Sequence, residues 1–311
     1  MDQTGLPGSR WPVTLAPLAA AVALAAAAVA AGPPAAFGAT HTRAMTSRAN
    51  QVRQVIAYVT AAGKHTGTVT PIRAATNTAL PPVKVGLGPE AIAVTPDGKT
   101  AYVANANGHT VTPIRTATNT ALPSIKMGSG PIAVVIAPGG KTAYALNFGK
   151  PNGNGGTVIP IRTATNTALR PIRVGQEPQA IAITPDGKTI YVTNANGGTV
   201  TPIRTATNTA LRPIKTGSGP TTLAVTPDGK TAYVVNTGSS TVTPIRTATN
   251  TALRPVKTGQ KPLAIGVTPN GTTVYVVNEL SSTVTPISTA TSTALRPIKV
   301  GSFPLAIAIT A

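Results

Sequence analysis

The sequence predicts an all-β fold built from consecutive copies of one small antiparallel sheet, and three observations support this. A phrase close to TVTPIRTATNTAL begins at six places, namely Thr68, Thr110, Thr157, Thr199, Thr241 and Thr283. The intervals between them are 42 residues, except for one of 47 that holds an inserted loop at 150–154. Gly or Pro also interrupts each copy so often that no helix has room to form. A unit of this length matches the ~40–45 residues of one blade of a β-propeller.

Each unit is expected to contain four short strands, as its second copy shows. Residues Ala91–Thr95 alternate small and branched side chains, which is the period of a strand. The following Pro-Asp-Gly favours a tight turn, because Pro presets φ, Asp bonds back to the backbone and Gly accepts positive φ. Thr100–Ala104 and the β-branched segment Thr110–Thr116 form the second and third strands. Leu122–Met127 forms the fourth.

Proline and tyrosine recur at fixed positions of the unit. The third strand of each unit contains a Pro. Because Pro has no backbone N–H to donate to the ladder, we expect a bulge or an interrupted pairing there. These prolines are Pro71, Pro113, Pro160, Pro202, Pro244 and Pro286. All six tyrosines fall at one register of the unit and are expected to serve the packing of the blades. They are Tyr58, Tyr102, Tyr144, Tyr191, Tyr233 and Tyr275.

The repeated unit resembles a known family. Tyr191-Val192-Thr193-Asn194 spells YVTN, and the pattern GxxP–AIAxTPDGKxxYVxN–TVTxI–TATNT is similar to the YVTN-type β-propeller repeat of secreted and surface bacterial proteins. The resemblance covers residues ~57–311 and implies a propeller fold. This chain departs from the family in carrying Arg, as at Arg115, where an acidic residue often precedes TATN. It also has six copies, whereas family propellers commonly have seven blades.

The two ends of the repeat region look like complementary fragments of one unit. The chain enters the repeat at Ala57–Thr60 without an inner strand, and Leu305–Thr310 has the pattern of that missing strand. We therefore predict six four-stranded blades closed into a ring, with the C-terminal strand completing the first blade. Seven blades and an open six-unit solenoid are the alternatives.

The N-terminal region is predicted to direct export. Residues 1–39 combine a cation at Arg10, a long Ala- and Leu-rich apolar run and a small-residue exit, which is typical of a cleaved secretory signal peptide. An uncleaved membrane anchor is the alternative. Residues 40–56 form a basic flexible linker, and residues 57–311 form the propeller. The protein is expected to be secreted or associated with the cell envelope.

Composition excludes several kinds of chemistry. The chain has no Cys, which excludes disulfides, Cys-ligated metals and a thiol nucleophile. Its 26 Lys and Arg against 7 Asp and Glu give a net charge of +19, which favours a polyanionic partner. The only Trp is in the signal peptide, so stacking platforms for bases are nearly absent and sequence-specific nucleic-acid recognition is not expected. Alternatively, repeating bands of Lys and Arg serve only to keep a secreted protein soluble.

Candidate binding residues are those that depart from the repeat, because residues common to all copies serve the fold. The loops leading into each inner strand and the loops between the second and third strands are expected to open on one face around a central channel, where binding residues concentrate. The candidates are Glu90, His109, Phe148, Lys150, Glu177, Gln179, Lys261, Glu279 and Phe303. Alternatively, these departures from the repeat are neutral variation in solvated loops. No residue is assigned to catalysis or to a metal, and no cofactor is expected.

These observations predict a monomeric binding or scaffold protein that contacts its ligand at the channel-face loops. Its partner would be an envelope protein or an anionic polymer. One alternative is an electrostatic binder of wall polymer, polysaccharide or nucleic acid. The other is a propeller hydrolase or lactonase, suggested by analogy of fold alone. No hydrolase or nucleotide-binding motif is present, so we expect no enzyme activity.

Overall fold

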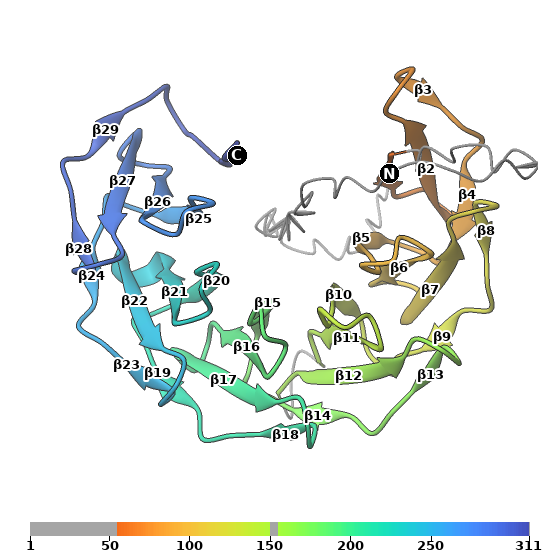
Figure 1. Ribbon diagram of the computed structural model, residues 1–311, viewed down its shortest axis with the longest axis horizontal. Helices are drawn as coiled ribbons and strands as arrows, with labels where there is room; N and C mark the ends of the chain where they lie inside the picture. The colour runs from red at the N-terminus through yellow and green to blue at the C-terminus, as the bar shows by residue number, and fades with distance from the viewer. Residues whose placement is uncertain (1–54, 150–154, 311) are drawn as a thin grey trace, which may run out of the picture.

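The computed structural model describes residues 55–149 and 155–310. These residues form six antiparallel sheets, numbered here one to six along the chain, that follow one another around an arc (Figure 1). The predicted signal peptide and residues 40–54 of the predicted linker lie outside the described residues. Strand β1 begins at Ile56, so the last linker position belongs to the first sheet. Within 55–149 and 155–310, no helix is long and apolar enough to cross a bilayer.

The strands of each sheet occupy successive positions from the inside of the arc outwards (Figure 1). Sheets two to six have an inner strand: β5 (Pro89–Val94), β10 (Pro131–Ile136), β15 (Pro178–Ile183), β20 (Pro220–Val225) and β25 (Pro262–Val267). The second strands are β1 (Ile56–Ala61), β6 (Thr100–Asn105), β11 (Thr142–Asn147), β16 (Thr189–Asn194), β21 (Thr231–Asn236) and β26 (Thr273–Asn278). The third strands are β2 (Gly67–Arg73), β7 (Thr110–Arg115), β12 (Thr157–Arg162), β17 (Thr199–Arg204), β22 (Thr241–Arg246) and β27 (Thr283–Ser288).

The outer edge of each sheet consists of two very short strands in place of the one predicted. They are β3 (Thr78–Ala79) and β4 (Val83–Val85), β8 (Thr120–Ala121) and β9 (Ile125–Lys126), β13 (Thr167–Ala168) and β14 (Ile172–Arg173), β18 (Thr209–Ala210) and β19 (Ile214–Lys215), β23 (Thr251–Ala252) and β24 (Val256–Lys257), and β28 (Thr293–Ala294) and β29 (Ile298–Lys299). Both pieces pair with the third strand of their sheet. A 3₁₀ turn at Thr237–Ser239 is the one helical element of the described residues.

The prolines of the third strands explain this split, and the predicted interruption is confirmed. In sheet two, β8 pairs with one end of β7 and β9 pairs with the other end. Between them, the backbone N–H of Leu122 donates to the carbonyl of Pro113 at 2.8 Å. Because Pro113 has no N–H to return on this outer side, the ladder cannot continue there. The pairing of β6 with β7 on the inner side keeps its register throughout.

The inner strands each contain a register shift one residue after they begin. In sheet two the shift lies between Pro89 and Ala91, so Glu90 is the extra residue; the same shift recurs in sheets three to six. Such a bulge bends a strand and increases its twist. The two candidate residues Glu90 and Gln179 therefore occupy bulge positions, which are part of the repeated backbone.

The core lies between neighbouring sheets, which pack face to face. The second strands of sheets two to five are buried on both faces over most of their length, which explains their largely apolar sequences. Each hydrophobic cluster combines residues of successive sheets; one of them joins Tyr102 and Val111 of sheet two with Ala143 and Ile161 of sheet three. The core is thus a series of similar interfaces between sheets, as in other repeat proteins.

Five of the six tyrosines pack in the clusters between neighbouring sheets, which agrees with their predicted packing role, and these five also link the sheets through hydrogen bonds. The hydroxyl of Tyr102 donates to Asn166 Oδ1 of the next sheet at 2.6 Å, and that of Tyr191 does the same to Asn250 at 2.6 Å. The hydroxyls of Tyr58 and Tyr144 donate to the equivalent Asn Oδ1 of their next sheets, both at 3.3 Å. The hydroxyl of Tyr233 forms a hydrogen bond with Ser292 Oγ of the last sheet at 3.3 Å. Sheet six has no following sheet, so the described residues offer Tyr275 no equivalent partner.

The C-terminal segment does not close the ring, so the predicted closure is wrong. Among the described residues, strand β1 pairs with β2 alone, and residues 302–310 form no strand. Instead the segment lies against β25, where a Cβ on Gly266 would be 2.9 Å from Ile309 Cδ1. This is the place beside β25 that a following inner strand would take. The six sheets cover less than a full circle, so the segment cannot reach sheet one (Figure 1).

The open end leaves apolar residues of sheet six uncovered. Ile298 in β29 is 48% exposed, whereas its equivalent Ile214 in β19 is 7% exposed because the next sheet covers it. The described part of the chain is therefore an open arc.

Candidate functional site

The loops at one end of the sheets lie together as the sequence predicts. In sheet two, the N–H of Ala106 donates to the carbonyl of Gly88 at 2.7 Å, which joins the loop before the inner strand to the loop after the second strand. Equivalent bonds join Phe148 to Gly130 and Glu279 to Lys261. We call this end of the sheets the loop face.

The candidate residues of the loop face are spread over separate sheets. Glu90 and His109 belong to sheet two, Phe148 to sheet three, Glu177 and Gln179 to sheet four, and Lys261 and Glu279 to sheet six, with Phe303 beyond β29. Lys150 lies outside the described residues. Phe148 and Phe303 are 37% and 65% exposed. The structure therefore does not gather these side chains into one cluster.

Lys261 and Glu279 are the exception, because their side chains form an ion pair. Lys261 Nζ is 2.7 Å from Glu279 Oε2, and the carboxylate side is the more buried of the two. The backbones are also bonded, since the N–H of Glu279 donates to the carbonyl of Lys261 at 3.1 Å. This pair joins two loops of sheet six, which gives it a structural purpose. No group of three or more His, Cys, Asp or Glu that could hold a metal occurs in the described residues.

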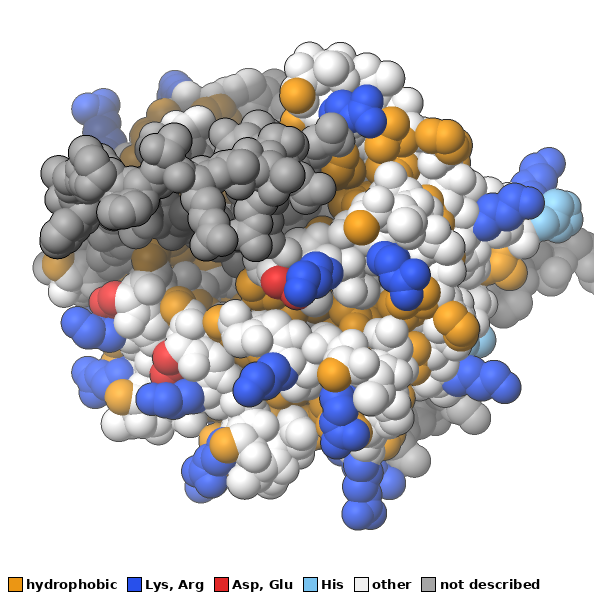
Figure 2. All heavy atoms as spheres, turned by 45° about the vertical axis from the view of Figure 1, so that its right-hand side comes forward, with side chains coloured by type: hydrophobic (Ala, Val, Ile, Leu, Met, Phe, Trp, Pro, Cys, Tyr) orange, Lys and Arg blue, Asp and Glu red, His pale blue; other side chains and the backbone are white. Residues whose placement is uncertain are grey.

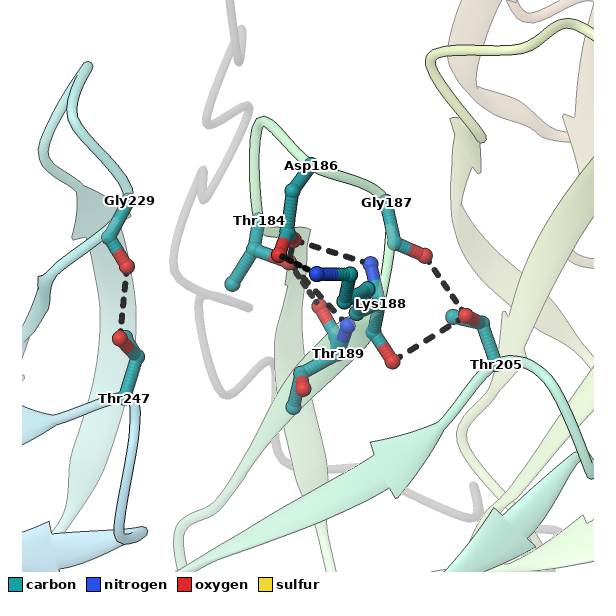
Figure 3. Close-up of polar contacts among 8 residues, drawn as sticks. All are labelled: Thr184, Asp186, Gly187, Lys188, Thr189, Thr205, Gly229 and Thr247. Atoms are coloured by element: carbon teal, nitrogen blue, oxygen red, sulfur yellow. Dashed lines mark hydrogen bonds and ion pairs between the residues drawn. The ribbon is translucent and has the colours of Figure 1, made fainter.

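The opposite end of the sheets carries the turns between the inner and second strands, and we call it the turn face. In sheet four, Thr184 Oγ1 donates to Asp186 Oδ1 at 2.6 Å, and the N–H of Lys188 donates to the same oxygen at 3.0 Å (Figure 3). These bonds, the Thr184 bond first, hold the pKa of Asp186 below its usual value. The carboxylate also pairs with Lys188 Nζ at 3.5 Å.

The turn is tied to the third strand by one further threonine. Thr205 Oγ1 donates to the carbonyls of Gly187 and Lys188 at 2.6 and 3.1 Å, and Thr247 makes the first of these bonds to Gly229 in sheet five (Figure 3). These contacts fix the backbone on either side of the turn lysine. The turn face therefore presents its cations on a rigid frame.

A lysine in the turn and an arginine at the end of the third strand recur together on the turn face. The turn lysine precedes the first residue of the second strand, and that residue pairs with the arginine that ends the third strand; in sheet three, Thr142 pairs with Arg162. The four pairs are Lys99 with Arg115, Lys141 with Arg162, Lys188 with Arg204 and Lys230 with Arg246. Two grooves open on this face, one of about 870 Å³ at sheets two and three and one of about 300 Å³ at sheet five.

Positive charge dominates the surface as a whole. The described residues include 21 Lys and Arg but six Asp and Glu, a net charge of +15. Four of these acids already hold a lysine in an ion pair. In Figure 2 the basic side chains are distributed over the visible face, and the few acidic ones lie beside them. The field is therefore broad rather than concentrated in one patch.

The Lys and Arg bands are visible in the sequence, but the candidate site was predicted at the other end of the sheets. The missed signal is a departure from the repeat at 137–140, where Ala-Pro-Gly-Gly replaces Thr-Pro-Asp-Gly. The same comparison between copies that selected the loop residues also selects this turn.

Comparison with known proteins supports the fold. No family model matches the sequence, and no curated protein matches it. Among solved structures, hydrazine synthase of Kuenenia stuttgartiensis is similar over 77% of this chain and 82% of that chain, with 24% identity and a TM-score of 0.62. A functionally unknown protein from Desulfotomaculum acetoxidans DSM 771 is similar over 76% of this chain and 80% of that chain, with 22% identity and a TM-score of 0.63.

These likenesses define the class of the protein by its fold alone. At such low identity they carry no activity over to this chain, and 1377 chains of solved structures match its architecture, so the fold does not select a function. The chain is an all-β repeat protein of the β-propeller type. Its function must be argued from its own surface.

Proposed function

We propose that this protein is an exported binding protein whose six sheets are propeller blades and whose ligand is an anionic polymer of the cell envelope or its surroundings. The observation that carries the proposal is the charge of the described surface, 21 basic against six acidic residues, with four of the acids already paired. A flexible polyanion can follow such distributed charge, whereas a small ligand needs convergent groups.

The placement of the cations supports a polymer as the ligand. The turn-face pairs recur from sheet two to sheet five, and the arginines at the ends of the third strands are exposed. Arg forks and Lys ammonium groups both suit phosphate and carboxylate oxygens. The proposed role is structural and non-catalytic, since the candidate loop residues do not converge. Export rests on the signal-like residues 1–39.

A salt titration tests this function. The purified chain is applied to immobilised polyglycerol phosphate, a teichoic-type polymer, at NaCl concentrations from about 50 to about 500 mM. Binding through phosphate contacts releases counterions, so we expect the logarithm of the affinity to fall linearly with the logarithm of salt concentration. Neutral dextran on the same support is the control.

Two results would overturn the proposal. One is retention that does not change between low and high salt, because contacts of this kind are screened. The other is equal retention on polyglycerol phosphate and on dextran, because a neutral polymer offers no oxyanion to the Lys and Arg side chains.

A further inference from the structure

The turn of sheet three keeps the backbone of the other turns but lacks their acid. In sheet three the N–H of Gly140 donates to the carbonyl of Ala137 at 2.7 Å, and in sheet four the N–H of Gly187 donates to that of Thr184 at 2.8 Å. The two turns therefore have the same shape. Gly139, however, stands where sheets two, four and five have an Asp that pairs with the turn lysine.

Lys141 and Arg162 consequently have no carboxylate from their own sheet beside them. Within the described residues, no Asp or Glu lies within ion-pair distance of either side chain. Their backbones are held together, because Thr142 pairs with Arg162 and the N–H of Thr163 donates to the carbonyl of Lys141 at 3.1 Å. The backbones that carry these two cations are thus fixed, and both residues line one groove.

The larger groove of the turn face lies at this same place. It has a volume of about 870 Å³ and spans sheets two and three. Its cations are Lys99, Lys141 and Arg162, and its one acid, Asp97, lies 3.8 Å from Lys99 Nζ. The rest of the lining consists of threonines, including Thr142 and Thr163, the two glycines of the turn and a few apolar side chains. At sheet five the groove is about 300 Å³, and its Lys230 is paired with Asp228.

We propose that the groove between sheets two and three binds one oxyanion group, phosphate or carboxylate, through Lys141 and Arg162. This deepens the proposed function, on which it rests, by naming the principal contact site for the polymer. The guanidinium offers a planar fork to two oxygens, and the ammonium adds a point charge. At the turns that have an Asp, the protein's own carboxylate already competes for the lysine.

Restoring the acid of the repeat is the sharpest test. Gly139→Asp places a carboxylate beside Lys141, and the change fits because a Cβ at Gly139 meets nothing within 4 Å and its φ is not left-handed. The matched control is Asn270→Asp, which adds the same charge to the equivalent turn of sheet six. Asn270 Oδ1 already accepts bonds from Thr268 and Thr272, and a carboxylate can accept both.

Binding of pyrophosphate and of oligogalacturonate is measured by calorimetry for the full chain and both variants. We expect Gly139→Asp to weaken binding of the preferred probe about two- to fivefold, the upper range for an exposed charge pair, and Asn270→Asp to change it less than about 1.5-fold. Binding of pyrophosphate identifies a phosphate site, and binding of oligogalacturonate alone identifies a carboxylate site.

The site proposal is overturned if neither probe binds, or if the two variants weaken binding equally, since equal effects mean that only the summed field matters. The outcome is separable from that of the proposed function. If polyglycerol phosphate binds with the expected salt dependence while Gly139→Asp and Asn270→Asp weaken probe binding equally, the site is wrong and the function stands. If the probes bind at the groove but the polymer does not bind, the site stands and the function is wrong.

Discussion

The bond from Tyr191 to Asn250 provides a direct test of how the sheets are held together. Tyr191 is fully buried, and its hydroxyl donates to Asn250 Oδ1 at 2.6 Å in the following sheet. Tyr191→Phe removes this hydrogen bond and keeps the ring, so the packing between sheets is unchanged. Removing one such bond costs about 1 kcal/mol, within a range of ~0.5–1.5 kcal/mol. For a chain of this size that corresponds to a fall in Tm of about 2–4 °C.

The control for this substitution is Tyr275→Phe in the last sheet. Tyr275 occupies the same register, but the described residues give its hydroxyl no acceptor. We therefore expect a change in unfolding free energy within about 0.5 kcal/mol, as for substitutions that remove no interaction. Thermal unfolding followed by far-ultraviolet circular dichroism measures both variants under one set of conditions.

A double-mutant cycle isolates the bond itself. Asn250 has φ +53°, a conformation that Gly adopts without strain, so Asn250→Gly removes the acceptor and preserves the turn. The coupling energy between Tyr191→Phe and Asn250→Gly should be about 1 kcal/mol. The reasoning fails if the coupling is zero, or if Tyr275→Phe destabilises the protein as much as Tyr191→Phe.

Two further predictions concern alkaline pH and one glycine. Burial, and secondarily the charges of Asp97 and Asp186, raises the pKa of Tyr102 and Tyr191 to about 12. In the unfolded chain the tyrosine pKa is ~10, so the stability that these two tyrosines confer is complete below pH ~10 and is lost as the pH rises through ~12. Urea unfolding from pH 9 to 12 measures the loss of stability, and tyrosinate absorbance measures the titration. Normal titration of every tyrosine in the folded protein would contradict this prediction. Gly175→Ala places a Cβ 2.6 Å from Asn194 Cγ and should cost about 1–3 kcal/mol in urea unfolding. Gly301→Ala meets nothing within 4 Å, so an equal loss there would show that crowding is not the cause.

Most of the strand positions could be predicted from the sequence because each is fixed locally. Pro, Asp and Gly at 96–98 determine a turn, and the predicted strand Thr100–Ala104 differs from β6 by one residue. The proline of the third strand correctly indicated an interrupted ladder. The split of the outer strand into β8 and β9 was not foreseen, because it depends on where the outer chain meets Pro113 across the sheet.

The candidate site was harder to predict, because a sequence repeat does not give the distance between copies. Glu90, Glu177 and Phe303 all depart from the repeat, yet each lies in its own part of the arc. Lys261 and Glu279 meet because both loops belong to sheet six. Gly139 is also visible as a departure in the sequence, but only the folded chain shows that a groove with Lys141 and Arg162 lies beside it.

The amino-acid sequence alone determined the repeating sheet, its strand order and its excess of positive charge, since these follow from local patterning and composition. Only the tertiary structure decided the curvature of the arc, because the angle between neighbouring sheets arises from the way the side chains between them pack. That angle leaves six sheets short of a full circle and places Ile309 against Gly266 of β25. The same packing brings the turns of sheets two and three together around one groove.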